Sequence, residues 1–113
     1  MVDIFADLAD VGFPVYQQGT APASLPDSFI TVWNDDTDDI LHADNKAKQC
    51  RYDWTLMFYT KDTEVIYSGL ISVINALKKR GYLISGQGYD TSGAWEGYDV
   101  RAVDVSKIEN LEG

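Results

Sequence analysis

The chain has 113 residues, 45% of them hydrophobic, which predicts one globular domain spanning 1–113 and excludes global disorder. Its 18 acidic and 9 basic residues give a net charge of −9. This excess of carboxylates argues against binding nucleic acid through a basic patch and against an anionic membrane surface.

The N-terminal element expected is a short amphipathic helix over 2–11. Its apolar residues recur at steps of three, and Gly12 is well placed to end it. The stripe consists of Val2, Phe5, Leu8 and Val11. Such a helix packs on the sheet of its own chain or docks on a neighbouring subunit. The same segment lacks the features of a signal peptide, and no stretch is long enough to span a bilayer, so we expect folding in a cytoplasm.

Residues 13–43 are expected to supply short strands and a loop. A strand over 13–17 leads into a loop at 18–26, which contains two prolines and a glycine. The segment 27–33 has apolar residues on both faces, which indicates a central strand or one that meets a partner. A further short strand is predicted at 40–43, so that 28–60 forms an antiparallel meander with an acidic tip.

The acidic tip, residues 35–39, is the strongest charge run of the sequence. Its carboxylates could form a solvated hairpin tip, contact a basic patch on a partner subunit, or bind a divalent cation. The run lacks the central glycine and closing glutamate of an EF-hand loop. The carboxylates concerned are Asp35, Asp36, Asp38 and Asp39.

The central strand is predicted at 49–60, where apolar and polar residues alternate. Its even positions, from Cys50 to Phe58, form the expected core face, and Cys50, the only cysteine, is interpreted as a buried hydrophobe. Its odd positions form a more polar face that we expect to meet an adjacent subunit. The named residues of this face are Arg51, Asp53, Thr55, Met57 and Tyr59.

The one long helix is predicted over 62–81, with Asp62 as N-cap and Gly81 as terminator. Its expected buried stripe consists of Ile66, Leu70, Val73, Ile74 and Leu77. Gly69 lowers helix propensity, which close packing on the sheet would explain.

The C-terminal third is expected to form a hairpin of 82–85 with 95–105, followed by a polar tail at 106–113. Runs of strands interrupted by one helix predict the α+β class with a mainly antiparallel sheet, covered by the long helix and the short N-terminal one. The expected order is α-β-β-β-β-α-β-β.

No motif for catalysis, metal binding or a cofactor stands out in the sequence. Gly86-Gln87-Gly88 opens no helix and is too short for a phosphate loop, and His42 is interpreted as a structural or surface residue. Aromatic residues exceed what one small core needs, so some are expected on an interaction surface. The set consists of Trp33, Tyr59, Tyr89, Trp95 and Tyr98.

The order and spacing of these elements resemble the tail terminator, or tail completion, proteins of long-tailed bacteriophages and prophages. The resemblance covers nearly the whole chain and depends on four stretches: 13–16 after the amphipathic start, 26–31, 56–62 running into the helix, and 79–82 before the terminal hairpin. Head–tail connector proteins share much of this architecture.

The resemblance implies a structural protein without catalytic residues or cofactors, located in the virion at the head–tail junction after assembly in the host cytoplasm. It implies a homo-oligomeric ring, typically a hexamer, that caps the tail tube and joins it to the head connector. The candidate subunit interface consists of Trp33, Asp35, Asp36, Asp38, Asp39, Arg51, Asp53, Tyr59, Tyr89 and Trp95. The alternatives are another connector component or an acidic DNA mimic that inhibits a nucleic-acid enzyme; a small enzyme using His42 would need a deep pocket around it.

Overall fold

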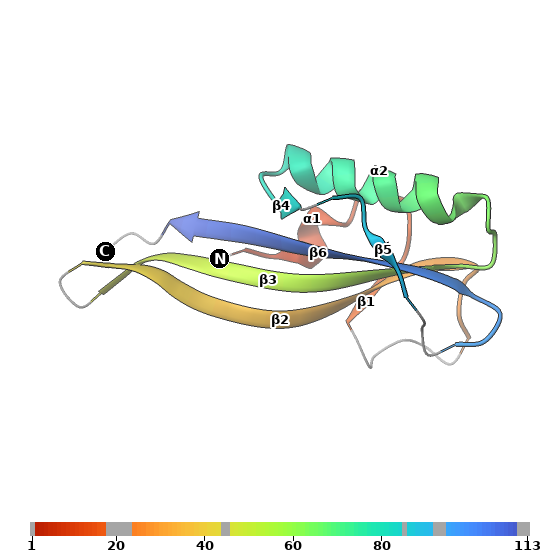
Figure 1. The fold of residues 1–113 in the computed structure, drawn as a ribbon, viewed down its shortest axis with the longest axis horizontal. Helices are drawn as coiled ribbons and strands as arrows, with labels where there is room; N and C mark the ends of the chain where they lie inside the picture. Colours follow the sequence, from red (N-terminus) through yellow and green to blue (C-terminus); the bar gives the residue numbers. More distant parts are fainter. Residues whose placement is uncertain (1, 18–23, 44–45, 85, 92–94, 111–113) are drawn as a thin grey trace.

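The computed structural model describes residues 2–17, 24–43, 46–84, 86–91 and 95–110, with the backbone alone described for 36–43 and 46–48. The fold is α+β, as predicted, with a six-stranded sheet and two helices. The molecule is elongated, 53 × 26 × 23 Å, because one hairpin projects from the body (Figure 1).

The sheet has the strand order β1-β2-β3-β6-β4, with β5 also paired to β6. Its strands are β1 (Val15–Gln17), β2 (Ser28–Ala43), β3 (Lys46–Thr60), β4 (Leu83–Ile84), β5 (Tyr89–Asp90) and β6 (Asp99–Asn110). Strand β1 is parallel to β2, whereas the other pairings are antiparallel. The sheet is therefore mixed, and the order of elements along the chain is α-β-β-β-α-β-β-β instead of the predicted α-β-β-β-β-α-β-β.

The β2–β3 hairpin is longer than the sequence predicts. Strand β2 continues through the acidic run, so the strands expected at 27–33 and 40–43 are one strand and the acidic residues do not form its tip. The register pairs Asp36 with Asp53 and Asp38 with Arg51. Pairing along β3 thus extends the strand through residues that favour turns in isolation.

Strand β6 also differs from its prediction, because it begins at Asp99 and includes residues 106–110 of the expected polar tail. These residues pair with β3 as far as Gln49 and Asn110, whose side chains are hydrogen-bonded at 2.9 Å. The outer edge of β6 pairs with β4 and β5 instead of one continuous hairpin strand.

Helix α2 (Val65–Lys79) covers one face of the sheet (Figure 1). The predicted stripe is confirmed, and with strand residues such as Leu56 and Val103 it forms the main core. The helix begins later than predicted: Glu64 is the N-cap residue, while the Asp62 carboxylate accepts a hydrogen bond from the Glu64 N–H at 3.0 Å. Cys50 is buried, as expected.

Helix α1 is restricted to Ile4–Asp7, with Asp3 as its N-cap. Ile4 and Leu8 reach the main core, whereas Phe5, which the predicted stripe placed inside, is exposed. The helix is shorter than the predicted 2–11, but Val2, Leu8 and Val11 of the predicted stripe do contact the main core. Neither described helix is long and apolar enough to cross a bilayer.

A second, smaller core lies on the other face of the sheet, around Phe29, Tyr59 and Val100. The Phe29 and Tyr59 rings are stacked with centroids 4.9 Å apart. Partly buried side chains complete the cluster: Tyr16, Leu25, Met57, Trp95 and Tyr98. This core occupies the end of the face near the start of β2, and no described element covers the rest of the face.

Tyr82 ties α1 to the strand edge, since its hydroxyl donates to Asp7 Oδ2 at 2.6 Å and its side chain is buried. Burial, followed by the hydrogen bond and charge of Asp7, raises the pKa of the Tyr82 phenol above its ordinary value of 10.0. Burial likewise raises the pKa of the Tyr52 phenol, to about 12.

We therefore expect stability to fall at alkaline pH. Above about pH 10 the unfolded chain loses phenol protons that the folded chain retains, so the free energy of unfolding decreases as the pH rises. For Tyr82 the decrease is at most about 1.4 kcal/mol per pH unit, and for the more exposed Tyr52 solvent screening makes it smaller. Below about pH 10 the contribution is fully present. Tyr82→Phe should remove the Tyr82 part of the slope in urea titrations between about pH 9 and 11.5. Equal slopes for the two proteins would contradict this assignment.

Candidate interaction surface

The sheet face opposite α2 is here called the open face. Its side chains follow from the register: Trp33 on β2, Thr55 on β3 and Asp104 on β6 stand in one cross-strand row. Alternation places Leu56 and Val103 under the helix and these three residues on the other side.

The Thr55 hydroxyl lies between two carboxylates. It is 2.6 Å from Asp35 Oδ2 and 3.0 Å from Asp104 Oδ1, and its single proton serves one of them at a time. Asp35 reaches this row because the register shifts between Asn34 and Asp36, and such irregularities re-aim side chains. Two negative charges are thus held beside one hydroxyl near the middle of the open face.

Tyr89 from β5 borders the same row, and its hydroxyl donates to Asp104 Oδ1 at 3.3 Å. Burial, then the Asp104 carboxylate and the charge of Asp35, raise the pKa of the Tyr89 phenol. The ring itself is 46% exposed. The electrostatic environment here is therefore negative beside an accessible aromatic ring.

Toward the hairpin, Asp53 is neutralised within the chain. It accepts from the Ser106 hydroxyl at 2.6 Å and pairs with Arg51 at 3.2 Å. This confirms the proximity of Arg51 and Asp53 expected from their same-face spacing on the strand. By contrast, Asp35 and Asp104 form no ion pair with any described cation.

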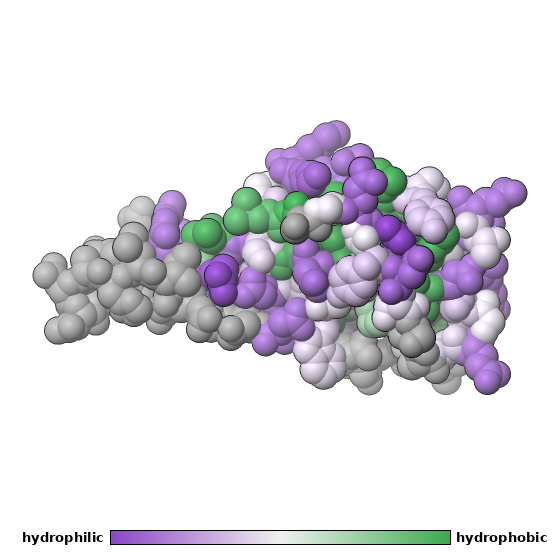
Figure 2. Space-filling view, in the orientation of Figure 1, coloured by the Kyte–Doolittle hydropathy of each residue, from purple (hydrophilic) through white to green (hydrophobic). Residues whose placement is uncertain are grey.

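Exposed apolar side chains concentrate on this face. Of six exposed large hydrophobic residues in the described part of the chain, four fall here by register. They are Trp33, Tyr89, Leu83 and Ile108, with 55%, 46%, 57% and 40% of their surface exposed. Leu83 and Ile108 line a shallow hollow of about 590 Å³, and Figure 2 shows hydrophobic surface beside β4 and the end of β6.

The remaining predicted interface residues are placed differently. Tyr59 is 1% exposed within the second core, so the expectation that it faces a neighbouring subunit is wrong. Trp95 is partly buried against Phe29 and Tyr59, with ring centroids 5.4 and 5.0 Å away. The side chains of Asp36, Asp38 and Asp39, and of His42, lie outside the described residues, although their backbone belongs to β2.

Sequence reasoning missed three residues of the open face: Leu83, Asp104 and Ile108. Asp104 alternates with Val103 and Val105, and that period of two was the available signal for a polar face. Leu83 and Ile108 were missed because β6 continues into 106–110, which the sequence predicted to be a polar tail, and Leu83 pairs there with Ser106.

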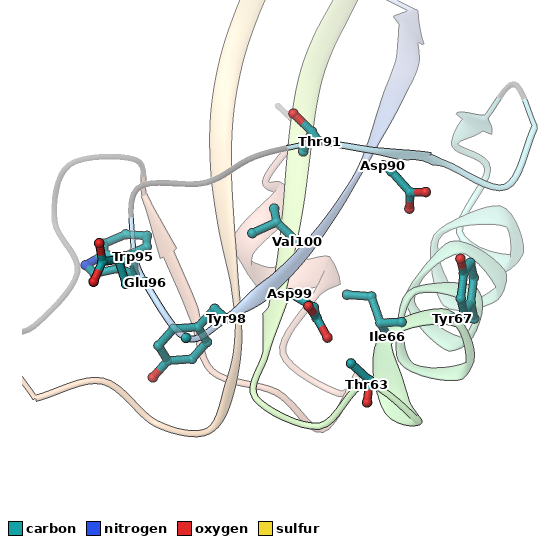
Figure 3. A pocket seen from close by; sticks show the side chains of 11 residues that line it. Thr63, Ile66, Tyr67, Asp90, Thr91, Trp95, Glu96, Tyr98, Asp99 and Val100 are labelled. Atoms are coloured by element: carbon teal, nitrogen blue, oxygen red, sulfur yellow. The ribbon is translucent and has the colours of Figure 1, made fainter.

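A cavity of about 630 Å³ opens between the start of α2 and residues 95–100. Figure 3 shows Trp95, Glu96 and Tyr98 on one side of it and Tyr67 of α2 on the other. One of its carboxylates, Asp90, is paired with Arg101 at 2.7 Å. No described lining residue is a His, Cys or Lys, so the hydroxyls of Thr63 and Thr91 have no imidazole or amine beside them in the lining to activate them as nucleophiles.

Neither a scan of the sequence against protein-family models nor a search among curated proteins finds a match. The geometry of the open face is therefore the main guide to what the protein does.

Proposed function

We propose that this protein is a structural subunit of bacteriophage assembly, of the tail terminator kind. It forms a ring that caps the tail tube and joins it to the head connector, and it acts in the virion without catalysis or cofactor. The observation that carries the proposal is the open face, where exposed aromatic and aliphatic side chains surround carboxylates that no described cation neutralises.

Such a surface suits a protein–protein contact. Exposed apolar side chains rimmed by polar ones mark interaction sites, and Trp and Tyr are enriched among the residues that carry the binding energy of interfaces. The second core makes the face rigid, because stacked and edge-on rings hold β2 and β3 at one end of it. A rigid face loses little entropy on binding.

The projecting β2–β3 hairpin supports the same function. Beyond Val32 the outer side of β2 has no strand partner among the described residues, so its backbone donors and acceptors are available to a neighbour. In a ring, an arm of this kind can reach the adjacent subunit or the tube beneath.

The proposal predicts self-association of the purified protein. Native mass spectrometry and sedimentation, at concentrations from about 1 to 100 µM, should show one closed oligomer of defined size, and electron microscopy should show it as a ring. Incubation with tail tubes from the phage or prophage that carries the gene should place the ring at the tube end. A protein that stays monomeric at every concentration and does not associate with those tubes would contradict the proposal.

A further inference from the structure

Pairing of the open face with itself is electrostatically unfavourable near its middle. Asp35 and Asp104 lie near its middle beside Thr55 and have no described cationic partner, so two open faces brought together would oppose their charges. Like-charge juxtaposition across an interface is strongly unfavourable. The occupant of this face must therefore carry positive charge, together with a surface that accepts the Trp33 ring.

This chain offers such a surface at the C-terminal end of α2. Lys78 and Lys79 lie in its last turn, both exposed, and form no ion pair with any described residue. Arg80 follows but is committed to Asp7 and Asp10, at 3.7 and 3.2 Å. Two uncommitted cations in a chain of net charge −9 make this helix end distinctive.

The same helix end is hollowed. A depression of about 470 Å³ on the outer side of α2 is lined by Ser72, Asn75, Ala76, Lys79 and Arg80. Small side chains at its floor allow an indole to approach closely, and the cations at its rim can lie against the ring face, the arrangement in which Trp binds cations best.

We infer that the open face of one copy docks on the C-terminal end of α2 of the next copy, with Trp33 in the hollow and Asp35 and Asp104 opposite Lys78 and Lys79. This rests on the proposed function and names the contact that builds its ring. Helix α2 covers one face of the sheet, and the open face is the other. The outer side of α2 and the open face therefore point in opposite directions (Figure 1). Contacts between different patches on opposite sides propagate from copy to copy and close into a ring when the rotation permits.

Charge reversal tests the contact. A face variant, Asp35→Lys with Asp104→Lys, and a helix variant, Lys78→Glu with Lys79→Glu, should each raise the concentration for half-assembly at least about tenfold. Raising NaCl from about 0.05 to 0.5 M should weaken wild-type assembly, because both charge pairs are exposed to solvent. Circular dichroism and urea unfolding establish that each variant is folded.

Complementation makes the test specific. A mixture of the face and helix variants should form rings in which the two alternate, because every contact in that order joins opposite charges. A chain that carries all four reversals should assemble alone. The matched control, Asp27→Lys with Glu64→Lys, changes the same net charge near the start of β2 and of α2, away from both surfaces, and should assemble more readily than the face variant.

The outcomes separate this contact from the proposed function. If the wild type forms rings and the reversal variants assemble equally well, the contact is wrong but the ring stands. The same conclusion follows if the variants are impaired and neither the mixture nor the chain with all four reversals restores assembly. A wild-type protein that never assembles would overturn both. Restoration by both routes establishes the pairing, since a merely structural loss could not be repaired by reversing charges elsewhere.

Discussion

Phe29→Ala is expected to destabilise the fold by about 3–5 kcal/mol, a large part of the stability of a domain this size. Phe29 is fully buried in the second core and contacts four other rings, with centroid distances from 4.9 to 5.9 Å. Its removal leaves a cavity that β2 and β3 cannot fill without breaking their register. Urea unfolding followed by circular dichroism would measure the change.

Trp33→Ala is the matched control, because Trp33 lies on the same strand and the same sheet face. Its ring is 55% exposed, so its truncation should change the free energy of unfolding by about 1 kcal/mol or less while impairing assembly. If the two substitutions destabilised the monomer equally, the distinction between a core end and an interaction end of this face would be wrong.

The division of this sheet face into a core end and an interaction end could not be predicted from the sequence. Alternation along 49–60 correctly separates the core face from a second face, because a strand has a period of two. It does not say what covers the second face. Tyr59 shares its periodicity with Asp53 and Thr55, yet it is buried because residues from β1, β6 and the segment before β6 close over that end of the sheet.

The acidic run shows local propensity being overridden. Asp favours turns, so the sequence predicts an acidic hairpin tip at 35–39. Strand β3, however, offers a continuous partner from Thr60 back to Lys46, and each residue of β2 that pairs gains backbone hydrogen bonds. Residues 106–110 follow the same logic on the other side of β3, where a polar segment becomes a strand because an edge is available.

The direction of β1 relative to β2 could not be predicted from the sequence either. The pattern at 13–17 indicates a short strand, which the structure confirms at Val15–Gln17, but not that it runs parallel to β2. Helix α2 was the most predictable element, since its apolar stripe recurs over four turns and has a single possible buried side.

The candidate surface was partly predictable. Trp33, Arg51 and Asp53 lie on the open face, as strand alternation suggested. Asp35 and Tyr89 also lie there, but they were candidates by residue type alone, because neither was expected in a strand. The aliphatic side of the face and Asp104 were not found, because they depend on which residues of β6 oppose β3 and β4. Cations in the last turn of a helix are expected from the helix dipole alone, so residue type does not reveal that Lys78 and Lys79 form no ion pair with any described residue.

Gly69→Ala reverses the usual expectation for a glycine inside a helix. Helix propensity alone predicts a gain of about 1 kcal/mol. A Cβ at this position, however, would lie 2.6 Å from Phe58 Cζ and 2.8 Å from Cε2. Phe58 is fully buried and its ring also packs edge-on against Phe13, at a centroid distance of 4.9 Å, so it has little room to move. Overpacking of this kind costs about 1–3 kcal/mol, and the net result expected is destabilisation, larger for Gly69→Val.

Two further variants show whether the cause is contact with Phe58. Ser72→Ala, at an exposed position of the same helix, should be neutral or slightly stabilising, since it changes propensity without touching the sheet. Phe58→Leu should cost less in the Gly69→Ala background than in the wild type, because the smaller side chain makes room for the new methyl group. Additive effects in this double-mutant cycle, or a stabilising Gly69→Ala, would mean that α2 and β3 are not held together as closely as the glycine implies.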